Sequence, residues 1–493
     1  TSDSRLSWFV IGGYKKLPNE VGGKDTALPE NVPNEMKELL FSTNNAHKLG
    51  EVVRRLLTII TLLLFAGRLA AAEKQIFVSS AEELRSLGNI KAGSEVVWRN
   101  GDYADVVITI NALGTAKKPV IFRAETTGGV RFTGLSRLRI KGKYVIVKGF
   151  WWQNPTIEKG VVVSFDKHSS YSRLVECAIT GFDCEMRPNC NVKWVSIWGY
   201  RNRVERCSLL DKRDLGQNLI VRINKGDHPP KAIIRNCHFS RPRSLLNEKG
   251  NRINGQCCIR IGTSNVAQQQ AECVVERCHF EQCNGEGEVI SSKSCGNTFR
   301  NNLFYECRGS LTLRHGNNSQ VVANYFIGNG EPLSAGVRIV GEGHTVARNY
   351  FEGLQIGTYG SIQMIMGHAN ASAGGYQQVK GVTIDGNTIV NCRYGISAND
   401  ARRKECVMPV VDTRVEGNTI VAEDGCCTIS CEDADHQIDW AKNTIYGGVQ
   451  RGISIVESKK KPNIPNIEQA LRAIRTNAGV SFMNNFITFV PQK

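Results

Sequence analysis

The chain has 493 residues, of which 41% are hydrophobic and 22% charged, and it contains 48 glycines but only 14 prolines. This composition is typical of a soluble globular protein with many tight turns, and it excludes collagen-like and disordered chains. The formal net charge of +16 favours an anionic partner, although a basic surface without one is the plain alternative. Because no helix-turn-helix, zinc-finger or RNA-binding motif is present, we expect an acidic polysaccharide and no nucleic acid.

The first segment with a clear pattern is a hydrophobic run over residues 56–67, which follows Arg54 and Arg55 and precedes three alanines at 70–72. A basic flank, an apolar stretch and a small-residue cleavage site form the secretory pattern, and the run is too short to span a bilayer. We therefore predict a signal peptide over residues 52–72 and a secreted or periplasmic bacterial protein with no stable membrane span.

A signal peptide should stand at the start of a protein, but residues 1–51 precede this one. We interpret them as upstream sequence translated from a wrong start site, with a genuine N-terminal extension as the alternative. The predicted mature domain is 73–493.

A short strand motif recurs through this domain, from about residue 76 to 455: a β-branched residue, two mostly polar residues, Asn or Cys, one further residue, then Phe, Ile or Leu. Successive Asn or Cys positions are 30, 30, 41, 24, 22, 25, 38 and 31 residues apart. These positions are Cys177, Cys207, Cys237, Cys278, Asn302, Asn324, Asn349, Asn387 and Asn418. A coil of three short strands and three turns needs about the shortest of these spacings, with insertions explaining the rest.

The predicted fold is therefore all-β, a single-stranded right-handed parallel β-helix (a solenoid). Each residue should lie about 4.8 Å from its counterpart one coil away, so the recurring Asn and Cys should form a ladder at a bend. The cysteines at that position are interpreted as small buried hydrophobic residues rather than disulfide partners. A short helix is predicted over residues 467–479.

Two carboxylates, Glu286 and Glu288, lie two residues apart, which on a strand places both on one face. Lys293 follows them, and Arg314 comes 21 residues later, close to one coil. We therefore predict that Arg314 lies directly above or below Lys293. Asn254, 32 residues before Glu286, can reach the same face from the previous coil across a loop.

Two further residues extend this group. Arg338, 24 residues after Arg314, should lie one coil further along and bind substrate. His315 is a candidate substrate-binding residue, with a structural role in a turn as the alternative.

The segments NGxxxIRIGTS, ExExxxxKS, LTLRHGN, NYFxGN and GVRIVGEGHxVxxNYFEG occur in this order and resemble polysaccharide lyase family six, the chondroitinase B and alginate lyase family. The resemblance implies that Asn254, Glu286 and Glu288 hold Ca²⁺, that Lys293 is the catalytic base and that Arg314 is the acid. The chain departs from the family at Cys257, where Glu is frequent. This departure affects the edge of the metal site.

The resemblance implies a monomeric secreted lyase that cleaves a uronate polymer, most simply alginate, by calcium-assisted β-elimination and leaves an unsaturated uronate end. Ca²⁺ and Arg314 should lower the pKa of Lys293 by repulsion between like charges. A dermatan sulfate or chondroitin lyase is the alternative within the family, because Arg402 and Arg403 could meet a sulfate. A non-catalytic carbohydrate-binding β-helix is the alternative outside it. A polygalacturonase-type hydrolase needs an Asp cluster that is not seen around Lys293.

Overall fold

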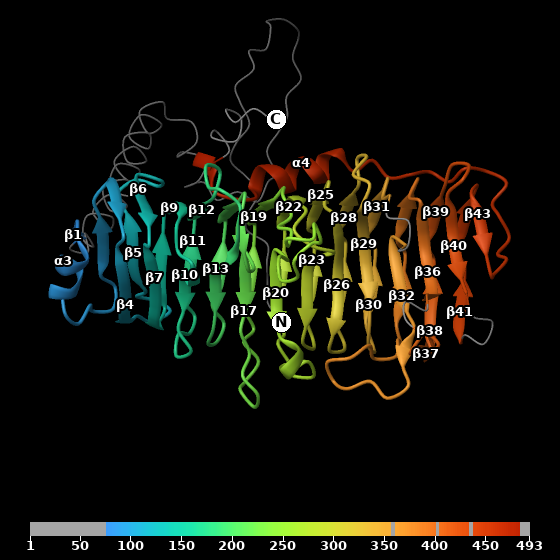
Figure 1. Cartoon of the computed structure of the whole chain (residues 1–493), viewed down its shortest axis with the longest axis horizontal. Coiled ribbons are helices and arrows are strands. Elements are labelled where there is room, and N and C mark those ends of the chain that lie inside the picture. Colours follow the sequence, from blue (N-terminus) through green and yellow to red (C-terminus); the bar gives the residue numbers. More distant parts are fainter. Residues whose placement is uncertain (1–74, 356–359, 401–403, 433–436, 484–493) are drawn as a thin grey trace, which may run out of the picture. The chain divides into compact units, whose positions relative to one another are not determined.

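The computed structural model describes residues 75–355, 360–400, 404–432 and 437–483, all within the compact unit Glu73–Lys493. The predictions for residues 1–51, for the signal peptide and for Arg402 and Arg403 lie outside these residues. Within them the predicted right-handed parallel β-helix is confirmed, since successive coils stack on one another and form three long parallel sheets along the stack (Figure 1).

From β2 onward each coil supplies one strand to each sheet in the order A, C, B, whereas β1 is followed by α3; all pairs along the three sheets are parallel. Sheet A consists of β1 (Gln75–Val78), β2 (Glu95–Trp98), β5 (Val120–Ala124), β8 (Val145–Lys148), β11 (Arg173–Val175), β14 (Arg203–Glu205), β18 (Ile233–Arg235), β21 (Val274–Glu276), β24 (Thr298–Arg300), β27 (Gln320–Val322), β30 (Thr345–Ala347), β34 (Thr383–Asp385), β38 (Thr413–Glu416) and β41 (Ile438–Ala441). Sheet C consists of β3 (Gly101–Ala104), β6 (Val130–Gly134), β9 (Phe150–Pro155), β12 (Ala178–Thr180), β15 (Ser208–Leu210), β19 (His238–Arg241), β22 (His279–Cys283), β25 (Leu303–Tyr305), β28 (Tyr325–Ile327), β31 (Tyr350–Glu352), β35 (Thr388–Val390), β39 (Thr419–Val421) and β42 (Thr444–Tyr446).

Sheet B carries the longer strands and, as shown below, the candidate site. It consists of β4 (Val107–Leu113), β7 (Arg137–Lys143), β10 (Lys159–Phe165), β13 (Arg187–Ile197), β17 (Leu219–Val221), β20 (Ile259–Gly262), β23 (Glu288–Lys293), β26 (Gly309–His315), β29 (Ser334–Ile339), β32 (Ile362–Ile365), β36 (Tyr394–Asp400), β40 (Cys427–Cys431) and β43 (Val449–Arg451), with β16 (Asp214–Leu215) paired beside β13. A separate antiparallel pair joins β33 (Gly367–His368) to β37 (Cys406–Met408).

The predicted ladder forms at the bend between sheets A and C. Asparagines are joined by hydrogen bonds of 2.9–3.0 Å from each Nδ2 to the next Oδ1, in the order Asn302, Asn324, Asn349, Asn387, Asn418 and Asn443, and all but the last are buried. Before them the same position holds Cys177, Cys207, Cys237 and Cys278, each at most 1% exposed and free of disulfides. The residue before each position has a positive φ, for example 49° at Arg206 and 55° at Asn301, which turns the chain sharply.

Short helices cover the end and one flank of the stack. Helix α3 (Ala81–Ser86) follows β1, and its Ser80 N-cap accepts a hydrogen bond from the amide of Glu83 at 3.1 Å. Helix α4 (Glu468–Asn477) falls inside the predicted stretch and lies along sheet C (Figure 1), with the Arg475 guanidinium 4.4 Å from the Tyr305 ring centroid. Neither these nor any other helix in the described part of the chain combines the length and apolar character needed to cross a membrane.

Candidate functional site

The candidate site lies on the outer face of four neighbouring strands of sheet B, β20, β23, β26 and β29. Alternate residues of these strands point into the core, and Ile290, Leu311 and Leu313 are fully buried there. The other residues face outward, and the register aligns Arg260, Ser291, Thr312 and Arg338 in one row. This outer face carries the predicted catalytic and metal-binding side chains.

Glu286 anchors the loop that holds Asn254. Its two carboxylate oxygens accept hydrogen bonds from the backbone amides of Gly255 (2.7 Å) and Cys257 (2.8 Å). Asn254, next to Gly255, is exposed. The loop that carries Asn254 is therefore tied to Glu286 through its backbone, and the role of the Asn254 side chain stays a prediction.

Glu288 lies between two guanidinium groups. Arg338 donates from Nη2 to Glu288 Oε1 at 2.5 Å, and Arg314 Nε lies 4.0 Å from the same oxygen. The three side chains are largely buried, so this charge cluster is little screened by solvent. Arg338 lies on the next strand after Arg314, as predicted, but its register partner is Thr312.

Lys293 ends β23 and is half-buried. A register shift between Ser292 and Lys293 pairs Lys293 with His315. The prediction that Arg314 lies directly above or below Lys293 was therefore wrong by one residue. The pKa of Lys293 is lowered by burial first, then by Arg260, with Glu288 opposing and Arg314 adding to the effect.

His315 is buried beside this lysine. Burial, followed by Arg314 and Lys293, lowers its pKa to about 3, so the ring is neutral at physiological pH. Arg314 Nη1 lies 3.4 Å from Nδ1, and Ser264 Oγ lies 3.2 Å from Nε2. Because a guanidinium only donates, Nδ1 is the acceptor and the ring proton is assigned to Nε2.

Two contributors were missed by the sequence reasoning. Arg260 is the cation with the largest effect on the pKa of Lys293, and it lies in the IRIG segment one coil earlier, where strand spacing could have found it. Tyr376 stacks on Arg314, with the guanidinium carbon 4.3 Å from the ring centroid, and Gly375 O accepts from Arg314 Nη1 at 3.5 Å. Gly375 and Tyr376 lie in the irregular insertion between β32 and β34. This insertion does not follow the repeat, so sequence spacing could not predict the contact.

The donor chemistry here fits a hard divalent cation. Asn254, Glu286 and Glu288 offer amide and carboxylate oxygens, the ligand type that Ca²⁺ prefers. Cys257 is buried, and its thiol pKa is raised well above its ordinary value by burial and then by Glu286. A neutral thiol adds no hard ligand, so any cation at this edge would depend on the three oxygen donors.

Comparisons with known proteins point in one direction. The family model described as Chondroitinase B matches residues 78–447. No curated protein matches the chain. Among solved structures, a polysaccharide lyase family 6 alginate lyase, AlyGC, is 29% identical with a TM-score of 0.71, and the match covers 83% of this chain and 57% of that one. This chain therefore spans little more than half of the length of AlyGC.

A mannuronic acid specific polysaccharide family 6 lyase from human gut microbiota is 23% identical with a TM-score of 0.68. That match covers 84% of this chain and 100% of the other. At this identity the likeness concerns the fold alone.

Proposed function

This chain belongs to the chondroitinase B family, polysaccharide lyase family 6, and from that membership we propose that it cleaves a uronate polymer, alginate in the first place, by calcium-assisted β-elimination. The observation that carries the proposal is the convergence of Lys293, Arg314 and His315 on adjacent strands beside Glu286 and Glu288. An amine with a lowered pKa next to a guanidinium is suited to proton abstraction and leaving-group stabilisation.

In the proposed reaction the neutral amine of Lys293 takes the C5 proton beside the uronate carboxylate. The C4–O bond then breaks, and a double bond forms between C4 and C5. Arg314 donates a hydrogen bond to the leaving oxygen, and because a guanidinium holds its protons tightly, the proton itself comes from water. His315, neutral with Nδ1 as acceptor, keeps the Arg314 guanidinium in place.

Asn254, Glu286 and Glu288 are the residues that would hold calcium. When bound, it would neutralise the charge that develops on the substrate carboxylate. Glu286 contributes a carboxylate already fixed by two backbone amides, which lowers the entropy lost on binding.

The choice of alginate is supported by the similarity to AlyGC, an alginate lyase, and the match to the Chondroitinase B model keeps dermatan sulfate as the second candidate. Export from the cell belongs to the same proposal. It depends on residues 52–72, outside the described part of the chain.

The test is to incubate the protein with alginate, dermatan sulfate and polygalacturonate and to follow ultraviolet absorbance, because an unsaturated uronate absorbs and a hydrolysis product does not. An increase with alginate supports the proposal, and an increase with dermatan sulfate alone corrects the substrate. Shorter products without absorbance would overturn the elimination mechanism.

A further inference from the structure

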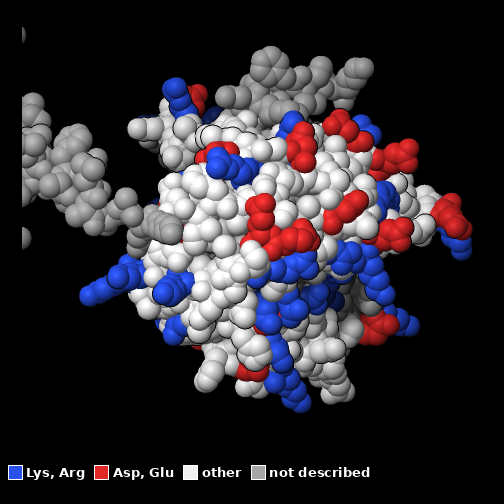
Figure 2. Space-filling model, turned by 90° about the vertical axis from the view of Figure 1, so that its left-hand side faces the viewer, with Lys and Arg blue, Asp and Glu red and all other residues white. Residues whose placement is uncertain are grey.

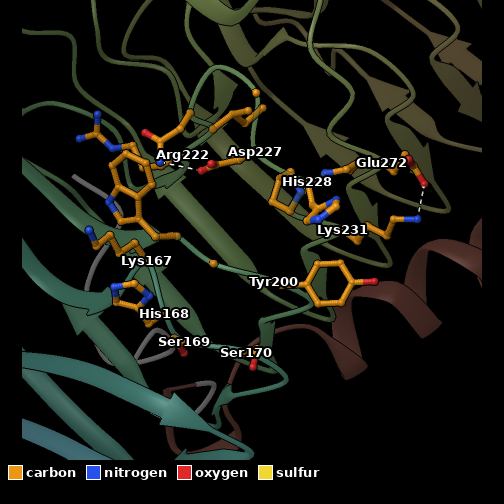
Figure 3. Close-up of a pocket in the computed structure, with 17 residues that line it drawn as sticks. Lys167, His168, Ser169, Ser170, Tyr200, Arg222, Asp227, His228, Lys231 and Glu272 are labelled. Atoms are coloured by element: carbon orange, nitrogen blue, oxygen red, sulfur yellow. Dashed lines mark hydrogen bonds and ion pairs between the residues drawn. The ribbon is translucent and has the colours of Figure 1, made fainter.

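A hollow of about 970 Å³ opens on the coils that precede the candidate site (Figure 3). Its walls are the segments that follow β10, β13 and β17, including Lys167, Trp198 and Arg222. A second hollow of about 710 Å³ lies on the outer face of β4, β7 and β10 and shares Lys167, Trp198 and Asn224 with the first. The two together form one groove along the edge of sheet B.

This groove is in line with Lys293. Trp198 and Arg222 each follow the last paired residue of their strand, where Ile197 pairs with Val221. Val221 pairs with Ile261 and Gly262 with Lys293, so the same row continues through Arg222 and Gly262 to the lysine. From β13 to β23 there are three steps between strands, about 14 Å at about 4.8 Å each. A short oligosaccharide spans such a distance, whereas one sugar does not.

The groove offers an aromatic surface between two cations. Trp198 is half-buried, and the Arg222 guanidinium carbon lies 5.8 Å from its ring centroid. Lys167 is exposed beside it, and within the described residues neither Lys167 nor Arg222 has a carboxylate partner. Arg222 Nε is buried and lacks a hydrogen-bond partner there.

The acidic groups of the groove are already bound to its own side chains. Glu272 forms an ion pair with Lys231 at 2.8 Å, and Asp227 accepts from Asn224 Nδ2 at 2.7 Å. Asp166 forms an ion pair with Arg139. Asp227 keeps its charge because Asn224 is neutral, but five Lys and Arg side chains line the two hollows against three acidic ones, so the net charge of the groove is positive. Figure 2, seen from the end that carries β1, shows Lys and Arg gathered below a band of Asp and Glu on this end of the molecule.

We propose that this groove is a distal subsite that binds an acidic sugar of the same polymer several units away from the bond that is cleaved. Trp198 packs against the apolar C–H face of a sugar ring, and Lys167 and Arg222 pair with its carboxylate. The inference depends on the proposed function for the identity of the polymer. It adds that affinity should grow with chain length.

The experiment compares wild-type protein with Trp198→Ala and Lys167→Ala on a long polyuronate and on its trisaccharide. A trisaccharide whose bond lies at Lys293 has at most two sugars on either side of that bond, which is too short to cover the distance of about 14 Å to Trp198. We expect the KM for the polymer to rise about three- to ten-fold, as the loss of one aromatic or charged contact implies. Values for the trisaccharide and kcat for both substrates should stay unchanged. Trp198→Phe should restore most of the affinity, which excludes misfolding, and Lys461→Ala removes the same charge from the exposed segment between β43 and α4.

Calorimetric binding of the same polymer to Lys293→Ala, with and without Trp198→Ala, separates the subsite from the chemistry. Weaker binding in the double variant supports the subsite even if the wild-type protein makes no unsaturated product, in which case only the proposed function fails. An equal KM for polymer in Trp198→Ala and wild type, with cleavage intact, overturns the subsite alone. Absence of both binding and cleavage with every polyuronate overturns both.

Discussion

Replacing Glu286 by Gln should loosen the loop that carries Asn254 and leave the β-helix intact. In the wild-type protein each carboxylate oxygen accepts one backbone N–H, from Gly255 and from Cys257. An amide side chain has one acceptor oxygen, so one of these N–H groups would face an NH₂ donor. Leaving a buried donor unsatisfied costs about 1–3 kcal/mol, which is an increase of about 5- to 150-fold in local opening.

The effect should remain local because a buried side chain, Arg241, also binds the backbone of this loop. Arg241 is fully buried, and its Nη1 donates to Gln256 O at 2.9 Å and to Gly216 O at 2.8 Å. Hydrogen exchange measured by mass spectrometry should therefore show faster exchange in the peptide with Gly255 and Cys257, with nearly unchanged rates in β20 and β23.

Glu288→Gln is the matched control. It removes the same charge two residues away, but its carboxylate contacts Arg338 and Arg314 and no loop amide. Exchange in the loop should stay at the wild-type rate. Equal loosening in the two variants, or none in Glu286→Gln, would refute the anchoring role of Glu286.

Four other outcomes are expected. Lys293→Ala should lower kcat by roughly 10² to 10⁴ because the base is lost, and Lys293→Arg should be as inactive although the charge is kept; near-normal product formation would identify another base. Arg260→Gln removes a cation that lowers the pKa of Lys293, so the rising limb of the pH–rate profile should move to higher pH; an unmoved limb would contradict this. Chelation should abolish most turnover and added Ca²⁺ restore it, and full activity in excess chelator would exclude the metal. Burial lowers the pKa of His279 and His315 to about 3 and that of His344 to about 4, so these rings are neutral in the folded protein, whereas in the unfolded chain they take up a proton below about pH 6.5. Their contribution to the free energy of unfolding should therefore be fully present above about pH 6.5 and be lost as the pH falls toward these values, measured as the urea midpoint of unfolding. A midpoint that does not change with pH would show that these histidines are accessible to protons.

The ladder and the core could be predicted from the sequence because they repeat. A residue that occurs once in each coil must occupy one place in the cross-section, so spacing alone identifies Asn302 and Asn324 as neighbours. The same argument predicts the stacked rings from Phe239 to Phe351, whose neighbouring centroids lie 4.5–5.0 Å apart. Repetition carries no information about the insertions, and so the contact of Tyr376 with Arg314 could not be foreseen.

The error of one residue at Lys293 has a chemical consequence. Counting residues placed the lysine opposite Arg314, and the register shift places it opposite neutral His315 instead. Burial and Arg260, which lies one coil earlier, therefore dominate the lowering of the lysine pKa, and Arg314 contributes less. Arg314 contacts Glu288 and Tyr376, which fix its guanidinium for its proposed role at the leaving oxygen. The proposed base and the proposed leaving-group donor are thus tuned by different coils, so Arg260→Gln should move the pH–rate limb without the loss of leaving-group stabilisation that Arg314→Ala would cause.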